Sequence, residues 1–505
     1  MRQSNDRSTG RWVRVSLTGV IGLALATTVL TTSAGAASTP GVTSTSINIG
    51  ATVPLTGPAA PGYDEIAPAM NAFFAWVNAH GGVDGRKINY NYLDDGYNPA
   101  NTATLTRKLV LQDNIFADVG SLGTPTQAAV QAFLNTQKVP QLFIESGCNC
   151  WSNPKFPESF GWQPPYTVEG KILGAYIKSH FAGEKVGYLS QGDEFGQDFV
   201  KGLDKEIPSA SVVSRQTYDA STLAGPLSNQ VAALKAAGAQ VVAMATIPAA
   251  TALAMLPAAA IGYQPQYVIS NVGADAPTVG PLLSSFTLAG KGTAAQAKAT
   301  AGLLNGVITD SYFAPESDVS NPWVQVEKKL LAKYAPSLYA KAGLDGNTQY
   351  GIALAYTFVQ ALQAAGKNLT RAGLVAAIEK SGKNFVTPGF VPLSYSSSVH
   401  FGFQGAEVIK LSTTAPPAVT PTGSWIGGTA VTGVEVTNVG SGPVKKYTGK
   451  TSTPPRSWFP RRRQPDVATV QCACRHRWRG VVPPPSVRAS YFAIPPVPSL
   501  GLRSG

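Results

Sequence analysis

The sequence predicts an α/β protein of two lobes, each with a mostly parallel sheet that helices cover on both faces. Three observations support this prediction. Short β-like runs alternate with longer helical runs from about residue 46 to residue 411, a pattern typical of parallel sheets. That stretch is too long for one such sheet, so we expect two lobes. Apolar residues make up 44% of the chain and charged residues 13%, which suits large buried cores and argues against disorder.

The alternation is clear from the first element onward. Residues 47–53 form an apolar strand, and residues 67–78 carry Met70, Phe73 and Val77 at helical spacing before Gly81 and Gly82 end the helix. Further strands are expected at residues 87–93, 115–119, 141–144, 185–190, 212–218 and 240–245. Further helices are expected at residues 101–112, 126–136, 169–181, 197–206, 226–237, 324–334 and 350–365.

Residues 1–36 are interpreted as an export signal peptide. Four arginines precede the apolar stretch 15–30, and Ala34-Gly35-Ala36 supplies small residues for cleavage, so we expect the mature chain to begin near Ala37. The alternative is a retained membrane anchor, although the stretch is short and mildly apolar for about 30 Å of hydrocarbon. No Cys precedes Cys148, so no lipid-anchored cysteine is expected at the cleavage site.

The formal net charge of +12 is concentrated at the two ends of the chain. Residues 451–505 carry a net +8 and residues 1–36 a net +3, which leaves +1 for residues 37–450. Nucleic-acid binding needs basic residues gathered on one surface of the fold, so no nucleic-acid partner is expected. The Pro- and Arg-rich segment 451–505 is expected to be disordered or PPII-like. It either meets an anionic surface or is an accidental extension of the reading frame.

The cysteines leave two alternatives open. Export permits a disulfide, but Cys148 and Cys150 are only two residues apart, so a bridge between them would close a strained small loop. A bridge and two free thiols both remain open. Cys472 and Cys474 lie near His476 without the spacing of a zinc site, so no metal and no cofactor are expected.

A series of motifs then gives a family resemblance. The motifs are PLTG at residues 54–57, GGVDGRKI at 81–88, DDGYNP at 94–99, GSLGTPT at 120–126, VPQLF at 139–143, GWQP at 161–164 and FGQD at 195–198. In order and spacing they resemble the branched-chain amino acid (Leu/Ile/Val) binding proteins of ABC transporters, over about residues 47–411. The resemblance implies the type I periplasmic-binding-protein fold, in which three crossovers join two α/β lobes.

The resemblance also implies a division of the chain into segments. The first lobe would take residues 45–163 and return at 306–385. The second lobe would take residues 164–305 and return, with a C-terminal extension, at 386–450. The signal peptide at 1–36 and the tail at 451–505 lie outside both lobes.

The loop at 120–126 is the first candidate for ligand binding. It follows a strand and opens a helix, with Thr124 suited to the N-cap and Pro125 to the first helical position. Free N–H groups at a helix start attract an anion, and similar family members bind the ligand carboxylate here. The resemblance therefore assigns Leu122, Gly123 and Thr124 to the ligand, against the alternative of ordinary capping.

The segment after the strand at 141–144 is expected to form a second wall of the same pocket. The resemblance assigns Ser146, Gly147 and Cys148 to it through backbone groups and the serine hydroxyl. The alternative is a plain strand-to-loop turn.

Aromatic residues are expected to complete the pocket. Tyr63 and Tyr166 would supply apolar walls with polar tips, and Phe195 would close over the ligand from the second lobe. The alternatives are surface, hinge or core packing of these rings.

Two departures from the family pattern bear on the ligand. At the position where amino acid binders hold the ligand ammonium with a carboxylate, this chain has Val272, so Asp275 would substitute or Asn271 would accept a hydrogen bond. An amino acid, another carboxylate, an amide and an aromatic acid all remain candidate ligands. The family's early disulfide is also missing, because Tyr97 and Gly123 stand near its expected positions.

These observations predict an extracytoplasmic solute-binding protein, periplasmic or extracellular and associated with the cell surface. Its lobes would close around one small molecule by hinge motion and dock on an ABC permease. The ATPase would be a separate chain, because this one has no G-x-x-x-x-G-K-[ST] motif. The alternatives are a ligand-sensing receptor domain and a secreted enzyme. No enzyme is expected, because none of the four His lies in a nucleophile or metalloprotease motif.

Overall fold

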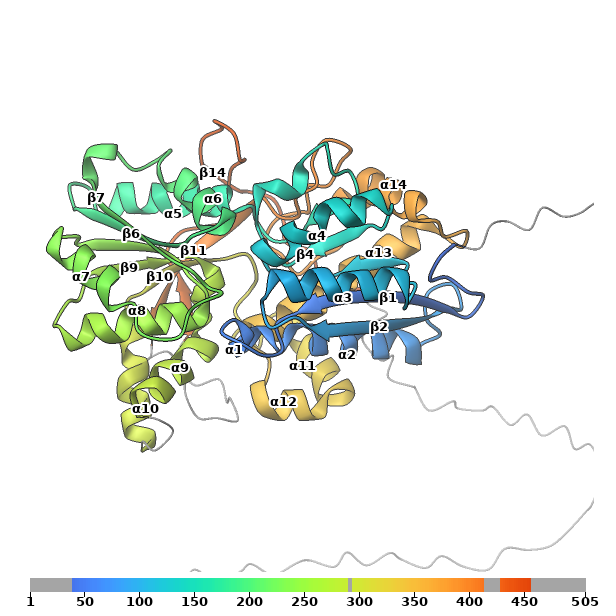
Figure 1. Ribbon diagram of the computed structural model, residues 1–505, viewed down its shortest axis with the longest axis horizontal. Helices are drawn as coiled ribbons and strands as arrows, with labels where there is room; N and C mark the ends of the chain where they lie inside the picture. Colours follow the sequence, from blue (N-terminus) through green and yellow to red (C-terminus); the bar gives the residue numbers. More distant parts are fainter. Residues whose placement is uncertain (1–38, 289–292, 413–426, 456–505) are drawn as a thin grey trace, which may run out of the picture. The chain divides into compact units, whose positions relative to one another are not determined.

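The computed structural model describes residues 39–288, 293–412 and 427–455 (Figure 1). The predicted signal peptide and residues 456–505 of the predicted tail lie outside the described residues. Among those that are described, none of the helices combines the length and the apolar character needed to cross a bilayer.

The first sheet contains five parallel strands. Their order across the sheet is β2 (Lys87–Asp94), β1 (Ser46–Val53), β3 (Ala117–Val119), β4 (Gln141–Ile144) and β5 (Ser159–Gly161). β3 and β4 are buried along their whole length, as expected of central strands that helices cover on both faces, and the edge strand β5 is buried as well.

Helices cover both faces of this sheet (Figure 1). α2 (Ile66–Ala79) packs against α13 (Gly346–Ala365) on one face, while α3 (Pro99–Leu111) packs against α4 (Thr124–Thr136) on the other. Four further helices complete this lobe: the short α1 (Ala60–Tyr63), α11 (Pro322–Tyr334), α12 (Pro336–Ala342) and α14 (Arg371–Ser381). Local sequence sets the helix starts: the Asn98 side chain accepts from Ala100 N at α3, and Asp345 forms a capping box with Thr348 at α13.

The second sheet is larger and mostly parallel. Its main strands, in order, are β7 (Val212–Tyr218), β6 (Val186–Gln191), β8 (Val241–Ala245), β9 (Gln266–Ile269), β10 (Ile308–Ser311) and β11 (Gly405–Ser412), of which only β11 runs antiparallel to its neighbour. The edge beyond β11 carries β12 (Gly427–Ala430), β13 (Glu435–Val436) and β14 (Lys445–Lys446). β10 pairs with β9, so residues 308–311 belong to this sheet, although the sequence-based boundary at residue 306 assigned them to the first lobe.

Helices also cover both faces of the second sheet. α5 (Tyr166–His180) and α6 (Glu194–Leu203) pack together on one face, and α7 (Ser228–Ala236), α8 (Pro248–Ala260) and α9 (Ala276–Leu288) lie on the other, followed by α10 (Ala294–Ala301) (Figure 1). The predicted class is therefore confirmed: two mostly parallel sheets, each covered by helices.

A buried lysine fixes the C-terminal hairpin onto the second lobe. Lys171 on α5 is 1% exposed, and its ammonium donates to the carbonyls of Asn438 (3.0 Å), Gly440 (3.2 Å) and Gly442. A buried charge is tolerated only when its donors are satisfied, and these carbonyls supply that.

Three segments connect the two lobes, and backbone hydrogen bonds join them to one another. The first segment follows β5, the second follows β10, and the third precedes β11. Phe403 N donates to Trp162 O (3.2 Å), and Phe390 N donates to Tyr312 O (3.0 Å). The three segments therefore form one unit between the sheets.

Trp162 lies at the centre of this unit. Its ring is fully buried and contacts the rings of Phe313, Tyr350 and Phe403, with centroids 5.7, 4.7 and 5.2 Å away. Its Nε1 donates to Thr357 Oγ1 on α13 at 3.0 Å. One side chain from the first connection thus packs against the second connection, the third connection and a helix of the first lobe.

We predict that Trp162→Ala lowers the free energy of unfolding by roughly 3–5 kcal/mol, because it removes a buried indole whose neighbours belong to three other chain segments. Trp162→Phe keeps a ring and loses the Nε1 hydrogen bond, so we expect a smaller loss of about 1–2 kcal/mol. Chemical denaturation followed by circular dichroism measures both. Equal stability of wild type and Trp162→Ala would contradict the central role of this ring.

Candidate ligand-binding site

A cavity of about 190 Å³ lies where the carboxyl ends of strands from both sheets face each other. One water needs only roughly 10–15 Å³ by such a measure, so a molecule of several non-hydrogen atoms fits. Its walls come from the loops that follow β3, β4, β9 and β10, from α1, and from the starts of α5, α6 and α13. Ligands in open α/β sheets bind at this edge, which makes the cavity the candidate site.

The structure brings seven of the ten sequence-derived site residues to this cavity. These are Tyr63, Leu122, Gly123, Thr124, Tyr166, Phe195 and Asn271. The other three, Ser146, Gly147 and Cys148, do not line it, although Ser146 and Gly147 hydrogen-bond to Thr124 and Tyr166, which do.

The start of α4 differs from the sequence expectation. Thr124 is the first helical residue rather than the N-cap, and the N-cap is Gly123 with φ of 108° and no side-chain capping bond. A glycine adopts this backbone conformation without steric cost, so the helix begins one residue earlier than a threonine cap would allow. The Thr124 hydroxyl is instead hydrogen-bonded to the Ser146 hydroxyl at 2.7 Å.

Gly123 also gives room to an aromatic ring. A Cβ at this position would lie 2.7 Å from Cε2 of Tyr97 and would clash with Thr126 Oγ1. Tyr97 and Gly123 are thus in direct contact, at the two positions where the family's early disulfide is expected.

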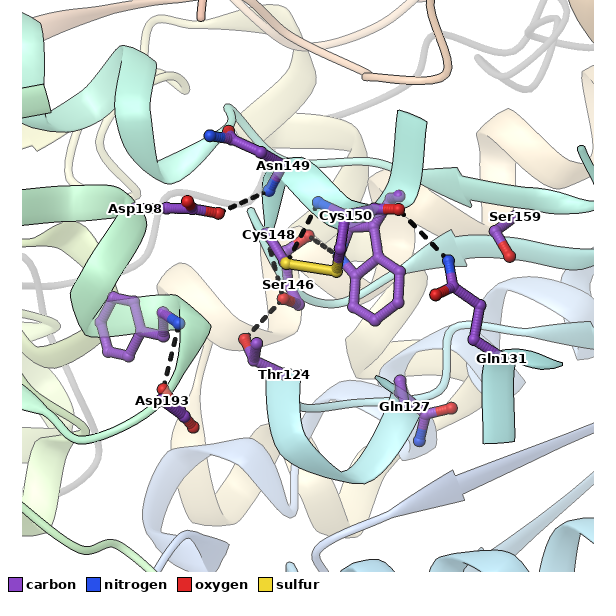
Figure 2. The surroundings of a disulfide bond; sticks show 12 residues. Thr124, Gln127, Gln131, Ser146, Cys148, Asn149, Cys150, Ser159, Asp193 and Asp198 are labelled. Carbon is purple, nitrogen blue, oxygen red and sulfur yellow. Dashed lines mark hydrogen bonds between the residues drawn. A yellow bond between two sulfur atoms is a disulfide. The ribbon is translucent and has the colours of Figure 1, made fainter. Parts of the chain in front are cut away.

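The turn after β4 is held by a disulfide between Cys148 and Cys150 (Figure 2). Of the two alternatives left open by the sequence, the structure therefore has the bridge. Around it, Trp151 Nε1 donates to Ser146 O (3.0 Å) and Cys148 N donates to Ser146 Oγ (3.2 Å). Gly147 supports the wall from behind, since its carbonyl accepts from Tyr166 N at 2.7 Å.

Hydrogen bonds between the lobes enclose the cavity. The Tyr63 hydroxyl donates to Val272 O at 2.6 Å, so Val272 contributes a carbonyl where the family has a carboxylate. A second hydrogen bond between the lobes runs from Asn149 N to Asp198 Oδ2 at 2.8 Å (Figure 2). Within the second lobe, the Tyr166 and Phe195 rings, which both line the cavity, meet at 4.4 Å between centroids. The lobes are therefore in contact around the cavity.

The two residues considered as substitutes for the missing carboxylate both line the cavity. Asp275 is engaged locally, since its Oδ2 accepts from Thr278 Oγ1 (2.5 Å), and burial raises its pKa to about 7. Asn271 donates through Nδ2 to Glu169 Oε1 (3.0 Å) and Asp310 Oδ2 (3.1 Å), so its amide donors point to carboxylates rather than to a ligand.

Sequence reasoning missed a group of carboxyl residues. Glu145, Asp310 and Glu316 line the cavity together with Asp275, and no Lys, Arg or His is found among the described residues that line it. Burial raises the pKa of all four, to about 7 for Glu316 and Asp275 and well above the usual range for Glu145. Glu145 follows directly after a predicted strand, a position that could have identified it. In the described part of the chain, no three His, Cys, Asp or Glu residues gather to hold a metal ion.

The model of the periplasmic binding protein family matches residues 46–413. The chain belongs to this family. The match spans both sheets described above, and the architecture is the type I periplasmic-binding-protein fold that the sequence motifs predicted.

Individual named proteins and solved structures resemble this chain at about 18–25% sequence identity. A Leu/Ile/Val-binding protein homolog 2 from Brucella abortus is 25% identical over 201 residues, which are 39% of this chain and 53% of that protein. The chain thus spans about half the length of the curated relatives it matches. A Thermus thermophilus branched chain amino acid ABC transporter structure with bound valine has a TM-score of 0.64 and 18% identity, covering 79% of this chain and 98% of that one. A fatty acid ABC transporter substrate-binding protein from Thermomonospora curvata has a TM-score of 0.63 and 22% identity, covering 79% and 95%.

We predict that Gly123→Ala is more destabilising than Gly81→Ala. Both glycines have a similar positive φ, 108° and 100°, so both substitutions carry a similar backbone strain of roughly 1–3 kcal/mol. Only Gly123 has neighbours that an added methyl group would strike, because no atom lies within 4 Å of a Cβ at Gly81. Urea denaturation of the two variants measures the difference, expected to be at least about 1 kcal/mol. A smaller loss for Gly123→Ala would contradict the close approach of Tyr97.

We predict that Asp118→Asn weakens the pH dependence of stability. Asp118 on β3 is fully buried with no partner for either carboxyl oxygen, and burial raises its pKa from 3.8 to about 7. The stability that this shift contributes is present below pH 4 and is lost as the pH rises through about 7. Between pH 5 and pH 8 the wild type should therefore lose up to about 3 kcal/mol more than the variant. Equal losses in parallel denaturation curves would show that Asp118 does not titrate in this range.

Proposed function

We propose that this protein is an exported solute-binding protein that closes around one small molecule and delivers it to an ABC importer. The observation that carries the proposal is the cavity between the facing strand ends of two lobes. Membership of the periplasmic binding protein family supports it.

Closure by hinge motion fits the way the lobes are connected. Three short segments join them, and the other contacts around the cavity are individual hydrogen bonds such as Tyr63 to Val272 and Asn149 to Asp198. Such bonds are separately weak, each stabilising by about 0.5–1.5 kcal/mol, so the lobes can part to admit a ligand. A bound ligand that contacts both lobes favours the closed state.

The proteins with similar folds do not define the ligand of this one. The Thermus thermophilus structure holds valine and the Thermomonospora curvata protein is named for fatty acids, so similar folds serve different ligands. The cavity here suits a small ligand with an apolar part, because Ile66, Leu122, Phe195 and Ile247 contribute to its walls.

The remaining parts of the proposal concern partners and location. The closed protein would dock on permease subunits in the membrane, with ATPase activity on separate chains. Residues 1–36 would direct export, which places the protein in the periplasm or outside the cell. The bound molecule would be released unchanged, so we propose a binding protein rather than an enzyme.

The test is a thermal-shift screen of the purified full-length chain after bound ligand has been removed by unfolding and refolding. The panel holds branched-chain amino acids, their keto and hydroxy acids, aliphatic amides, aliphatic amines and aromatic carboxylates. A ligand at about 100 times its Kd should stabilise the fold by roughly 2.7 kcal/mol. Small-angle scattering should then show a more compact protein with that ligand.

Two results would count against the proposal. One is a well-folded, ligand-free sample that no compound stabilises. The other is chemical conversion of a bound compound on prolonged incubation, which would favour an enzyme.

A further inference from the structure

The described chain continues beyond the part that the periplasmic binding protein family model matches. The match ends at residue 413, whereas residues 427–455 form β12, β13, β14 and the segment after them. Residues 447–455 are called the C-terminal strap below. Because the strap lies outside the match, the family fold does not account for it.

The strap starts on the second lobe. β14 pairs with β13, and β13 pairs with β11 of the second sheet. Lys205, which follows α6, donates to the carbonyls of Val439 (2.9 Å) and Gly440 (2.8 Å) in the turn between these two strands. Tyr447 N donates to Val434 O at 2.8 Å. The first residue of the strap is therefore fixed to the second lobe.

The strap ends on the first lobe. Trp323 Nε1 on α11 donates to Ser452 O at 3.0 Å, and the Ser452 hydroxyl donates to Thr387 O. Thr387 follows Val386, whose backbone is held to the Gln360 side chain on α13 by two hydrogen bonds of 2.8 Å each. Both anchors of Ser452 thus belong to the first lobe, because α11 and α13 are helices of that lobe.

The residues between the two ends of the strap are exposed. Residues 448–451 face solvent, whereas Ser452 is half-buried and Pro454 is buried. The strap is therefore held at both ends, and its middle crosses from one lobe to the other over the surface. From Tyr447 to Ser452 an extended chain spans at most about 18 Å, so the separation of the two anchors has an upper limit. The strap is a fourth link between the lobes, in addition to the three connections.

We propose that the C-terminal strap restrains the opening of the two lobes. A hinge rotation that parts the lobes moves α11 relative to β13 and β14, which stretches the strap or breaks the contacts of Ser452. The anchored strap therefore stabilises the arrangement in which the lobes meet around the cavity. The inference goes beyond the proposed function, because it concerns the lobes in the absence of any ligand.

The size of the restraint follows from the contacts that opening would break. Loss of the two hydrogen bonds of Ser452 should raise the ratio of open to closed molecules about tenfold. A protein that is closed less of the time binds any ligand of its closed state more weakly in proportion. The strap would in this way set the affinity without contacting the ligand.

The test cuts the strap in the folded protein. A protease recognition sequence inserted between Gly449 and Lys450 lets the chain fold before it is cut. The matched control carries the same sequence between Pro455 and Arg456. Both cuts break the covalent link from the lobes to residues 456–505, and only the first one separates the two anchors of the strap.

Pairs of nitroxide labels, one in each lobe, measure the opening by electron spin resonance. Leu111→Cys on α3 and Ile261→Cys after α8 replace exposed side chains and carry the labels, in a background of Cys472→Ser and Cys474→Ser. The two bridged cysteines do not take a label. In the absence of ligand, the first cut should raise the population of long distances about tenfold. The control cut should leave the distances as they are in the uncut protein.

A pair of point variants serves if the insertion prevents folding. Ser452→Ala removes one anchoring hydrogen bond, and Thr453→Ala is its control at an exposed neighbour. Ser452→Ala should lengthen the distances in the same direction as the cut and to a smaller extent, whereas Thr453→Ala should not change them.

Three results would overturn the inference. They are equal distance distributions after the two cuts, shorter distances after the first cut, and equal distributions for the two point variants. Each would show that the strap does not hold the lobes together. The measurement uses no ligand, so none of these results bears on the proposed function.

Discussion

The packing of Trp162 between the lobes is the constraint on which the rest of the structure depends. The cavity exists only where two separate sheets present their strand ends to each other, so its shape is set by how the connections hold the sheets. Trp162 contacts Phe313 and Phe403 from the other two connections and Tyr350 from α13. A fully buried indole at this place makes the connections move together rather than separately. Under the proposed function, the lobes would then open and close about connections that keep their packing.

The second constraint is the burial of carboxyl groups without cationic partners. Asp118 and Glu145 have no hydrogen-bond partner, and burial raises the pKa of both. Burial of this kind favours the neutral form, because an unpaired charge is costly at low dielectric.

Local sequence patterns were enough to predict much of the first lobe and little of its chemistry. Residues 67–78 were predicted as a helix, and α2 occupies Ile66–Ala79, because apolar residues at helical spacing pack on one face. β5 has only three residues, too short for a periodic pattern, and it was not predicted. The boundary at residue 306 missed β10, since pairing of β10 with β9 depends on contacts about 40 residues away in the sequence.

Prediction of the candidate site depended on family motifs rather than on periodicity. Tyr63, Thr124 and Asn271 could be named because the motifs place them, and they line the cavity. The cap at α4 was assigned to Thr124 because threonine is a common N-cap, whereas the backbone of Gly123 decides the helix start. Glu145 was missed because the lack of a hydrogen-bond partner for its carboxyl depends on how the surrounding residues pack. No local sequence pattern reveals such packing.

The turn held by the disulfide joins the ligand wall to the contact between the lobes. On one side of Cys148, the Ser146 hydroxyl bonds to Thr124 in the wall. On the other side, Asn149 donates through its backbone to Asp198 and through its side chain to Thr167 (2.7 Å), both in the second lobe. Residues 146–149 therefore contact both the cavity wall and the second lobe. The bridge from Cys148 to Cys150 lies in the same turn (Figure 2). Because both contacts belong to one turn, a ligand that displaced the wall under the proposed function would also displace the groups that meet the second lobe. The cavity wall and the contact between the lobes are in this way parts of the same local structure.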